Sequence, residues 1–405
     1  MQSNKLRMAI RATAAVAVFG MAAQAHAAVT IDTDGYEANV YGFVRAVATY
    51  DFDEKIANGG QAGNFSKITT DGSKTADGHF GADANTSRLG VQVMTPQGVK
   101  MVVEFDFDNN DSLEPRLRHA YGSYNGVLIG RNWSNFNSFV GNPSTLDFDG
   151  IPGSAGTQGR TEQIRYTTGA LSFSVEQPSS AGIGRDVPAA ASGFAMNSAG
   201  VIVASTPTVS TGSTKDSTPA FTVRLEDSQG GLTYSAALMA KQTAYDTAAA
   251  DDDAIGYAAF VAGKVMITDM LSVNGTVGYS DGATGYVYRA GGNFGQYDGY
   301  TDANGDIETV EAYGGAIGAS LALGDGSSVN LGYGMATVDL DDAVAPSTNL
   351  ATTTTDTNST MFINYQWVPI KDVKMGVEFA NLKTETQGGN DGDANRVMFL
   401  AQYNF

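Results

Sequence analysis

The sequence predicts an all-β fold, a 16-stranded antiparallel transmembrane β-barrel with short periplasmic turns, long extracellular loops and a third loop folded into the lumen. Three observations predict this fold. Apolar and polar residues alternate with a period of two, and tight turns alternate with long loops between the alternating segments. After the N-terminal region, no stretch is apolar over the ~20 residues that a transmembrane helix needs. In a membrane, a closed barrel is the remaining way to pair every backbone polar group.

The N-terminal region predicts export. A basic stretch is followed by the apolar residues 14–23 and by the small-x-small pattern AHA at residues 25–27, which together are typical of a secretory signal. The apolar part is too short to span a bilayer. We expect residues 1–27 to be a cleaved signal peptide and residues 28–405 to form a single barrel domain.

Period-two alternation locates the strands. In KMVVEFDFD, Met101 and Val103 face one side, while Lys100 and Glu104 face the other. The same pattern predicts strands near residues 38–51, 86–95, 99–108, 115–124, 127–133, 162–168, 171–177, 219–226, 232–242, 254–265, 270–280, 308–323, 328–338, 358–367, 372–381 and 395–405. The chain ends in FLAQYNF, an alternating segment. We expect this last strand to pair with the first and so remove both sheet edges.

The composition excludes some classes of function. A formal net charge of -19 argues against a nucleic-acid partner, which a basic patch would attract. With no cysteine, the chain forms no disulfide. The stretch TDANGDIE has acidic residues at calcium-loop spacing but lacks the glycine after the third ligand, so no metal site is predicted. No cofactor is predicted either.

Arginines concentrate in the first part of the predicted barrel. Seven fall between residues 45 and 165, among them Arg160. Alternation with outward apolar residues predicts that five of them face the lumen: Arg45, Arg88, Arg116, Arg118 and Arg165. A guanidinium is always charged and presents a rigid fork that suits carboxylates. These side chains therefore predict a basic wall that selects small anionic solutes.

A long loop between the fifth and sixth strands faces this wall. The segment NWSNFNSFVGNPSTLDFDGIPG carries several large aromatic residues, which would be costly in water, so we expect it to fold into the lumen. Its Asp147 and Asp149 would then lie opposite the arginines and create a field across the pore. Glu104, Asp106 and Asp108 form an acidic face that could instead pair with the arginines and leave the pore weakly selective or cation-selective.

The segments YGFVRAVATYDFD, SRLGVQVMTPQG, LEPRLRHAYGSYNGVLIGRNWSNF, PSTLDFDGIPG and QIRYT resemble the DcaP-like family of trimeric outer-membrane porins, from about residue 38 to 177. The resemblance implies a homotrimer in a Gram-negative outer membrane, in contact with membrane lipid and lipopolysaccharide. It also implies passive uptake of small anions such as dicarboxylates, and it adds Arg131 to the basic wall. Some family members carry an N-terminal coiled-coil extension; only about ten residues without heptads precede the first strand here.

Two other classes of function remain open. An outer-membrane hydrolase would need a nucleophile and a base, but His79 and His119 are the only histidines after the signal, and no G-x-S-x-G is present. Because Leu117 and Tyr121 are expected to face outward, His119 is predicted to face lipid or a neighbouring subunit. A structural barrel with a plugged lumen would be distinguished by the absence of conductance. We therefore expect a channel that makes or breaks no bond.

Overall fold

The computed structural model describes residues 29–73, 76–108, 114–155, 159–185, 194–196, 202–204, 214–246, 251–288, 297–302, 304–343 and 353–405. The predicted signal peptide lies outside the described residues. Among these residues, no helix is both long and apolar enough to cross a membrane.

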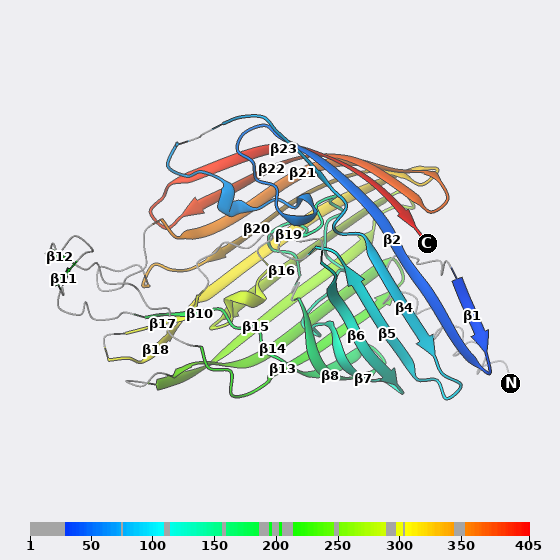
Figure 1. Cartoon of the computed structure of the whole chain (residues 1–405), viewed down its shortest axis with the longest axis horizontal. Coiled ribbons are helices and arrows are strands. Elements are labelled where there is room, and N and C mark those ends of the chain that lie inside the picture. The colour runs from blue at the N-terminus through cyan, green and yellow to red at the C-terminus, as the bar shows by residue number, and fades with distance from the viewer. Residues whose placement is uncertain are drawn as a thin grey trace.

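Most of the described residues form one closed antiparallel barrel (Figure 1), and two small sheets, β10-β17-β18 and β11-β12, lie outside its wall. Its wall consists of β2 (Tyr36–Asp51), β4 (Arg88–Met94), β5 (Lys100–Asp106), β6 (Arg116–Tyr124), β7 (Val127–Trp133), β8 (Arg160–Thr168), β9 (Leu171–Glu176), β13 (Ala220–Gln229), β14 (Leu232–Asp246), β15 (Asp251–Met266), β16 (Leu271–Asp281), β19 (Glu311–Gly324), β20 (Ser327–Val338), β21 (Thr355–Ile370), β22 (Val373–Thr386) and β23 (Asp391–Asn404). These are the sixteen predicted strands, with ends that differ by a few residues. A further strand that alternation did not predict, β3 (His79–Asp83), lies beside β4 on the same edge of β2.

The barrel closes where the sequence predicts. β23 pairs with β2 from Asn404↔Phe43 to Arg396↔Asp51, and the backbone amide of Phe405 donates to the carbonyl of Gly42. Figure 1 shows the red and blue strands side by side, with the C-terminus at the end opposite β11 and β12. A second unpredicted strand, β1 (Val29–Thr33), pairs with the first residues of β2, on the same edge as β23 but beyond the end of β23.

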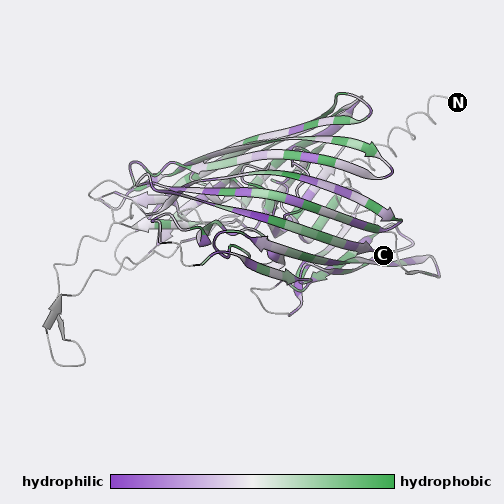
Figure 2. Cartoon of the chain, turned by 90° about the horizontal axis from the view of Figure 1, so that it is seen from above, coloured by the Kyte–Doolittle hydropathy of each residue, from purple (hydrophilic) through white to green (hydrophobic). Residues whose placement is uncertain are grey.

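Alternation gives the wall two different faces, visible as coloured bands along the strands in Figure 2. Outward positions carry exposed large apolar residues such as Val277 and Ile317, while their inward neighbours Thr276 and Ala316 are buried. The rims differ as well. Asn125 and Gly126, which join β6 to β7, both have positive φ, as a two-residue hairpin turn requires. The rim with such turns is called the short-turn rim, and the opposite one the long-loop rim.

Long loops supply much of the apolar core, and this core lies inside the barrel. One cluster joins Phe136 of the loop after β7 and Tyr286 of η3 (Thr284–Tyr286) to Phe260 of the wall. A second joins Phe65 of η2 (Phe65–Lys67) to Leu382 of the wall. The remaining short elements are η1 (Gly59–Gln61), β10 (Gly182–Arg185), β11 (Phe194–Met196), β12 (Ile202–Ala204), β17 (Tyr297–Thr301) and β18 (Ile307–Thr309).

The strands of the wall differ in length, so the wall is lower on one side of the barrel than on the other. β4, β5 and β7 have 7 residues each and β9 has 6, whereas β15 and β21 have 16. The low part of the wall, β4 to β9, carries most of the predicted arginines, so the candidate site lies on this side.

Candidate functional site

The loop of residues 134–159, between β7 and β8, is called the inner loop. Glycines on the opposite wall leave room for it. A Cβ added at Gly334 would lie 2.2 Å from the carbonyl oxygen of Pro152, and one added at Gly318 would lie 2.8 Å from the Pro143 ring. At Gly376 it would lie 2.8 Å from Leu146. The glycines that interrupt these strands thus form a seat for the inner loop.

Buried side chains of the wall then fasten the loop. Glu378 accepts hydrogen bonds from the Leu146 amide at 2.7 Å and from the Thr145 hydroxyl at 2.8 Å. Asn364 donates to the Ser144 carbonyl at 2.7 Å, and Asn274 donates to the Gly141 carbonyl at 2.7 Å. The inner loop therefore crosses the lumen and is held at the far wall, as the sequence analysis expected.

A β-bulge reverses the faces in the middle of β6. Glu104 pairs with His119 but Phe105 pairs with Leu117, so Arg118 is the extra residue. Arg118 and His119 consequently both lie inside, where the His119 ring centroid is 6.0 Å from that of Trp133. The prediction that His119 faces lipid or a subunit is wrong, and so is the outward placement of Tyr121, whose register partner is Gly130 rather than Ile129. Alternation cannot reveal an inserted residue.

Two predicted arginines are neutralised by carboxylates of the adjacent strand. Arg116 binds Asp106 through two hydrogen bonds of 2.9 and 2.8 Å and also contacts Asp108 at 3.2 Å. Arg118, with 1% of its side chain exposed, contacts Glu104 at 2.9 Å and Asp106 at 2.6 Å. Glu104 and Asp106 are therefore part of the basic wall itself and not a separate acidic face.

Arg131 does not belong to the wall of the lumen. It shares a face of β7 with Val127 and Ile129, both exposed on the outside, and its guanidinium lies 2.8 Å from Glu162 on β8. The predicted placement of Arg131 in the pore is wrong. Alternation within VLIGRNW carries the correct signal, because Arg131 is two residues from the outward Ile129.

Arg45 and Arg165 both donate hydrogen bonds to backbone carbonyls. Arg45 donates to the Leu146 carbonyl of the inner loop at 2.6 Å. Arg165 donates to the Trp133 carbonyl and, at 2.8 Å, to Gln163. Both retain their charge, but their donors fasten the loop and its start.

Arg88 and Arg160 differ from all of these. In the described part of the chain, neither donates a hydrogen bond; Arg88 has only a 3.9 Å ion pair with Glu104. Arg88 stacks on Phe43 at 5.0 Å, and Arg160 stacks on Trp133 at 4.4 Å, from guanidinium carbon to ring centroid. The charge of Arg88 also acts on Arg160. Arg160 was not among the arginines predicted to line the wall; alternation in β8 groups it with the outward Ile164, but the charges of Arg88, Arg116 and Arg118 act on it.

The two predicted aspartates of the inner loop point in different directions. Asp147 accepts from the Gly63 amide at 2.9 Å and lies 3.8 Å from Arg396, an arginine of β23 that the sequence analysis missed. Asp149 is nearer the low wall, where the charges of Arg116 and Arg160 act on it. Only Asp149 therefore lies where the predicted field across the lumen requires a carboxylate. The charge of Arg45 also acts on Asp147, but the Asp147 carboxylate is directed away from the low wall.

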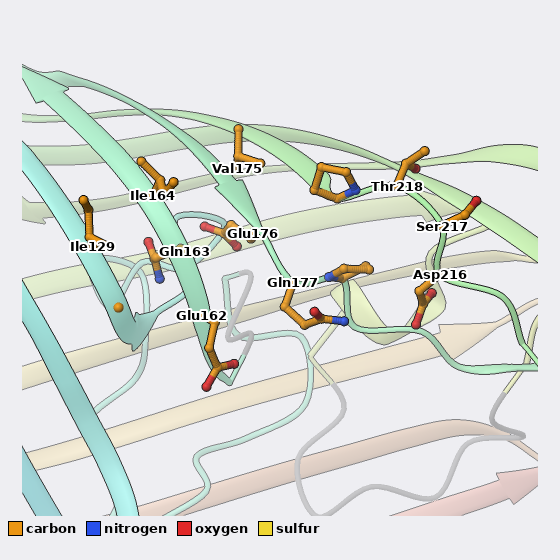
Figure 3. Close-up of a pocket in the computed structure, with 13 residues that line it drawn as sticks. Ile129, Glu162, Gln163, Ile164, Val175, Glu176, Gln177, Asp216, Ser217 and Thr218 are labelled. Carbon is orange, nitrogen blue, oxygen red and sulfur yellow. The ribbon is translucent and has the colours of Figure 1, made fainter.

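A separate cavity of about 460 Å³ lies on the outer side of the wall (Figure 3). Ile129, Ile164 and Val175, all exposed outward, line it next to Glu162 and Asp216. The buried Gln163 and Glu176 also border it, and none of the arginines of the low wall lines it. Among the described residues, no group of three or more His, Asp or Glu side chains is arranged to hold a metal ion.

Comparisons with known proteins agree with this architecture. A sequence model of the DcaP outer membrane protein family matches residues 19–171. The crystal structure of the outer membrane channel DcaP of Acinetobacter baumannii is similar with a TM-score of 0.73 and 29% identity, covering 92% of this chain and 99% of that chain. No curated protein sequence matches the chain.

More distant structures share the fold. An anion-selective porin from Comamonas acidovorans has a TM-score of 0.52 and 12% identity, covering 91% of this chain and 100% of that one. The trimer form of OmpT from Vibrio cholerae has a TM-score of 0.51 and 12% identity, covering 92% and 100%. The resemblance found in the sequence is thus confirmed: residues 19–171 match the DcaP outer membrane protein family, and the whole chain has the barrel of a porin of a Gram-negative outer membrane.

Proposed function

We propose that this porin is a passive diffusion channel for small hydrophilic solutes that prefers anions, and that it catalyses no reaction. The observation that carries the proposal is the pair of lumenal guanidiniums, Arg88 and Arg160, that donate no hydrogen bond within the described residues. Their donors are free to replace part of the hydration shell of a passing anion. Two such groups suit a solute with two carboxylates, so small dicarboxylates are the first solutes to test.

The carboxylates of the low wall limit this preference. Arg88, Arg116, Arg118 and Arg160 stand against Glu104, Asp106 and Asp108, an excess of one positive charge that Asp149 offsets when it is ionised. The formal charge of -19 belongs to the whole chain, and in physiological salt its field decays over about 8 Å. The nearby arginines therefore decide the selectivity, and the preference for anions is moderate rather than absolute.

The reversal potential of the purified protein in a planar bilayer under a KCl gradient tests the proposal. We expect a potential of the sign that chloride preference gives. A potential of the opposite sign would replace the proposal with a cation-selective porin. If folded protein gave no conductance at all, the lumen would be plugged and the channel function itself would be wrong.

Selectivity is expected to depend on pH through Asp149 of the inner loop. The pKa of Asp149 is raised to about 7, mainly by removal from bulk water and also by the carboxylates of Asp147 and Asp108, while Arg116 and Arg160 act in the opposite direction. Below that pKa the carboxyl is neutral, so a negative charge beside Arg160 disappears. We expect chloride preference to increase as the pH falls from 8 to 6, measured as a shift of the reversal potential.

Asp149→Asn is the control for this pH dependence. It should hold the selectivity at its low-pH level across the whole range, because the amide cannot ionise. If the variant shifts with pH as the wild type does, another group is responsible.

The porin assembles as a homotrimer through the low wall. Strands of six or seven residues, such as β9 and β7, are shorter than the ~9–11 residues that cross a bilayer, so lipid alone would not match this face. Its outside carries Ile129, Ile164 and Phe173 as well as the Arg131–Glu162 ion pair, which would be costly in lipid. Neighbouring copies would cover both features.

Tryptophan substitutions on the two sides of the barrel test this interface. Ile164 on β8 and Val277 on β16 are similarly exposed, at 59% and 64%. Ile164→Trp should overpack a protein contact at a cost of about 1–3 kcal/mol and lower the temperature at which the trimer dissociates on a detergent gel. Val277→Trp should leave that temperature unchanged because lipid adapts to the ring. If the two variants have the same dissociation temperature, the low wall is not the interface between copies.

A further inference from the structure

The ring of Phe148, in the inner loop, lies among three arginines of the low wall. The guanidinium carbons of Arg45, Arg88 and Arg118 are 5.5, 5.4 and 5.7 Å from the centroid of this one ring. All three distances are within the ~6 Å over which an aromatic face attracts a cation. The three arginines come from different strands, β2, β4 and β6, so the loop residue is the point at which their side chains converge.

The neighbours of Phe148 fix the direction of its ring. Before it, the Leu146 carbonyl accepts from Arg45, and the Asp147 carboxylate turns toward Gly63 and Arg396. After it, the Tyr288 hydroxyl donates to the Asp149 carbonyl. With the backbone held on both sides, Phe148 is directed to the arginines, while the carboxylate next to it is directed away.

An aromatic ring and a carboxylate hold arginine with different consequences. A carboxylate such as Asp106 cancels the charge of the arginine that it binds. The face of a ring attracts a guanidinium through its quadrupole but carries no net charge, so the guanidinium stays able to attract an anion. In this wall, Arg116 and Arg118 are bound by carboxylates, whereas Arg88 lies between the rings of Phe43 and Phe148.

We propose that Phe148 is a positioning residue for ion selectivity: where Arg45, Arg88 and Arg118 converge, its ring holds the guanidinium of Arg88 in the lumen without neutralising it. This inference rests on the proposed anion preference. Without the attraction of the ring, Arg88 is free to move onto Glu104, which already lies 3.9 Å away. The wall would then lose an uncompensated positive charge although every arginine is still present.

Fluorinated phenylalanines at position 148 provide a direct test. Each added fluorine weakens the quadrupole of the ring and changes its shape little. We expect the chloride-to-potassium permeability ratio to fall stepwise along the series, by roughly threefold for a strongly fluorinated ring, while single-channel conductance stays nearly constant. Phe136 provides the matched control: it lies in the same loop, but its ring packs against Phe260 and Tyr286, so fluorination there should leave the ratio unchanged.

Ordinary substitutions give a second readout. Phe148→Leu should lower the permeability ratio, and Phe148→Trp should keep it, because indole binds cations at least as well. The wild-type reversal potential tests the anion preference, whereas the change along the series tests Phe148, so the two can fail separately. A ratio that does not respond to fluorination would overturn the role of Phe148, even if the wild type prefers chloride. A cation-selective wild type whose ratio still fell along the series would keep the positioning role and reject only the anion preference.

Discussion

The double variant Arg88→Gln/Arg160→Gln is expected to lose most of the chloride preference of the channel. Neither guanidinium donates a hydrogen bond in the described residues, and glutamine keeps a polar side chain of similar reach. At close range, a charge contributes between about 1 kcal/mol in water and about 4 kcal/mol near protein. Since 1.4 kcal/mol corresponds to a factor of ten, the permeability ratio should fall roughly tenfold or more. The measurement is the reversal potential under a KCl gradient.

Arg131→Gln is the matched control for this experiment. Arg131 lies on the same side of the barrel, but it faces outward and pairs with Glu162 at 2.8 Å. Its replacement removes one positive charge from the chain and should leave the reversal potential at the wild-type value. If Arg131→Gln and the double variant shift the potential equally, long-range charge rather than the two lumenal arginines governs selectivity.

The wall of the barrel could be predicted because period-two alternation reports the face of each strand directly. All sixteen predicted strands are present, and the last one pairs with the first. The inner loop could also be predicted, since its aromatic residues need a buried surface. What alternation cannot report is an inserted residue. The bulge at Arg118 and His119 therefore reversed the predicted faces of His119 and Tyr121.

The site could be predicted only in part, because its chemistry depends on which strands become neighbours. The sequence locates the arginines but not their partners. Arg396 meets Asp51 only because the barrel closes in the register Asp51↔Arg396, across 345 residues of chain. Likewise, Arg116 and Arg118 are neutralised by β5, while Arg88, one strand away, is not. The family resemblance suggested a lumenal Arg131, and the local alternation, which places it outside, was the better guide there.

Glu378→Ala is expected to produce the largest change in pore size, because this carboxylate holds the middle of the inner loop. It accepts from the Leu146 amide, the Thr145 hydroxyl and the Asn364 amide. Alanine would leave these buried donors without an acceptor, at a cost of about 1–3 kcal/mol each. If the loop moves away from the wall, water can accept the hydrogen bonds of these donors. We therefore expect a larger and noisier single-channel conductance together with weaker selectivity, since Phe148 and Asp149 move with the loop.

Glu226→Ala separates this effect from the mere loss of a lumenal carboxylate. Glu226 also binds the inner loop, but among the described residues of that loop only the Ser138 hydroxyl, near the start, donates a hydrogen bond to it, at 2.8 Å. Its removal should therefore change conductance much less than Glu378→Ala does. Glu378→Gln, which keeps one carbonyl oxygen as an acceptor, should lie between Glu378→Ala and the wild type. If all three variants conduct like the wild type, the glycine seat and the apolar core hold the loop without Glu378, and the carboxylate does not set the width of the pore.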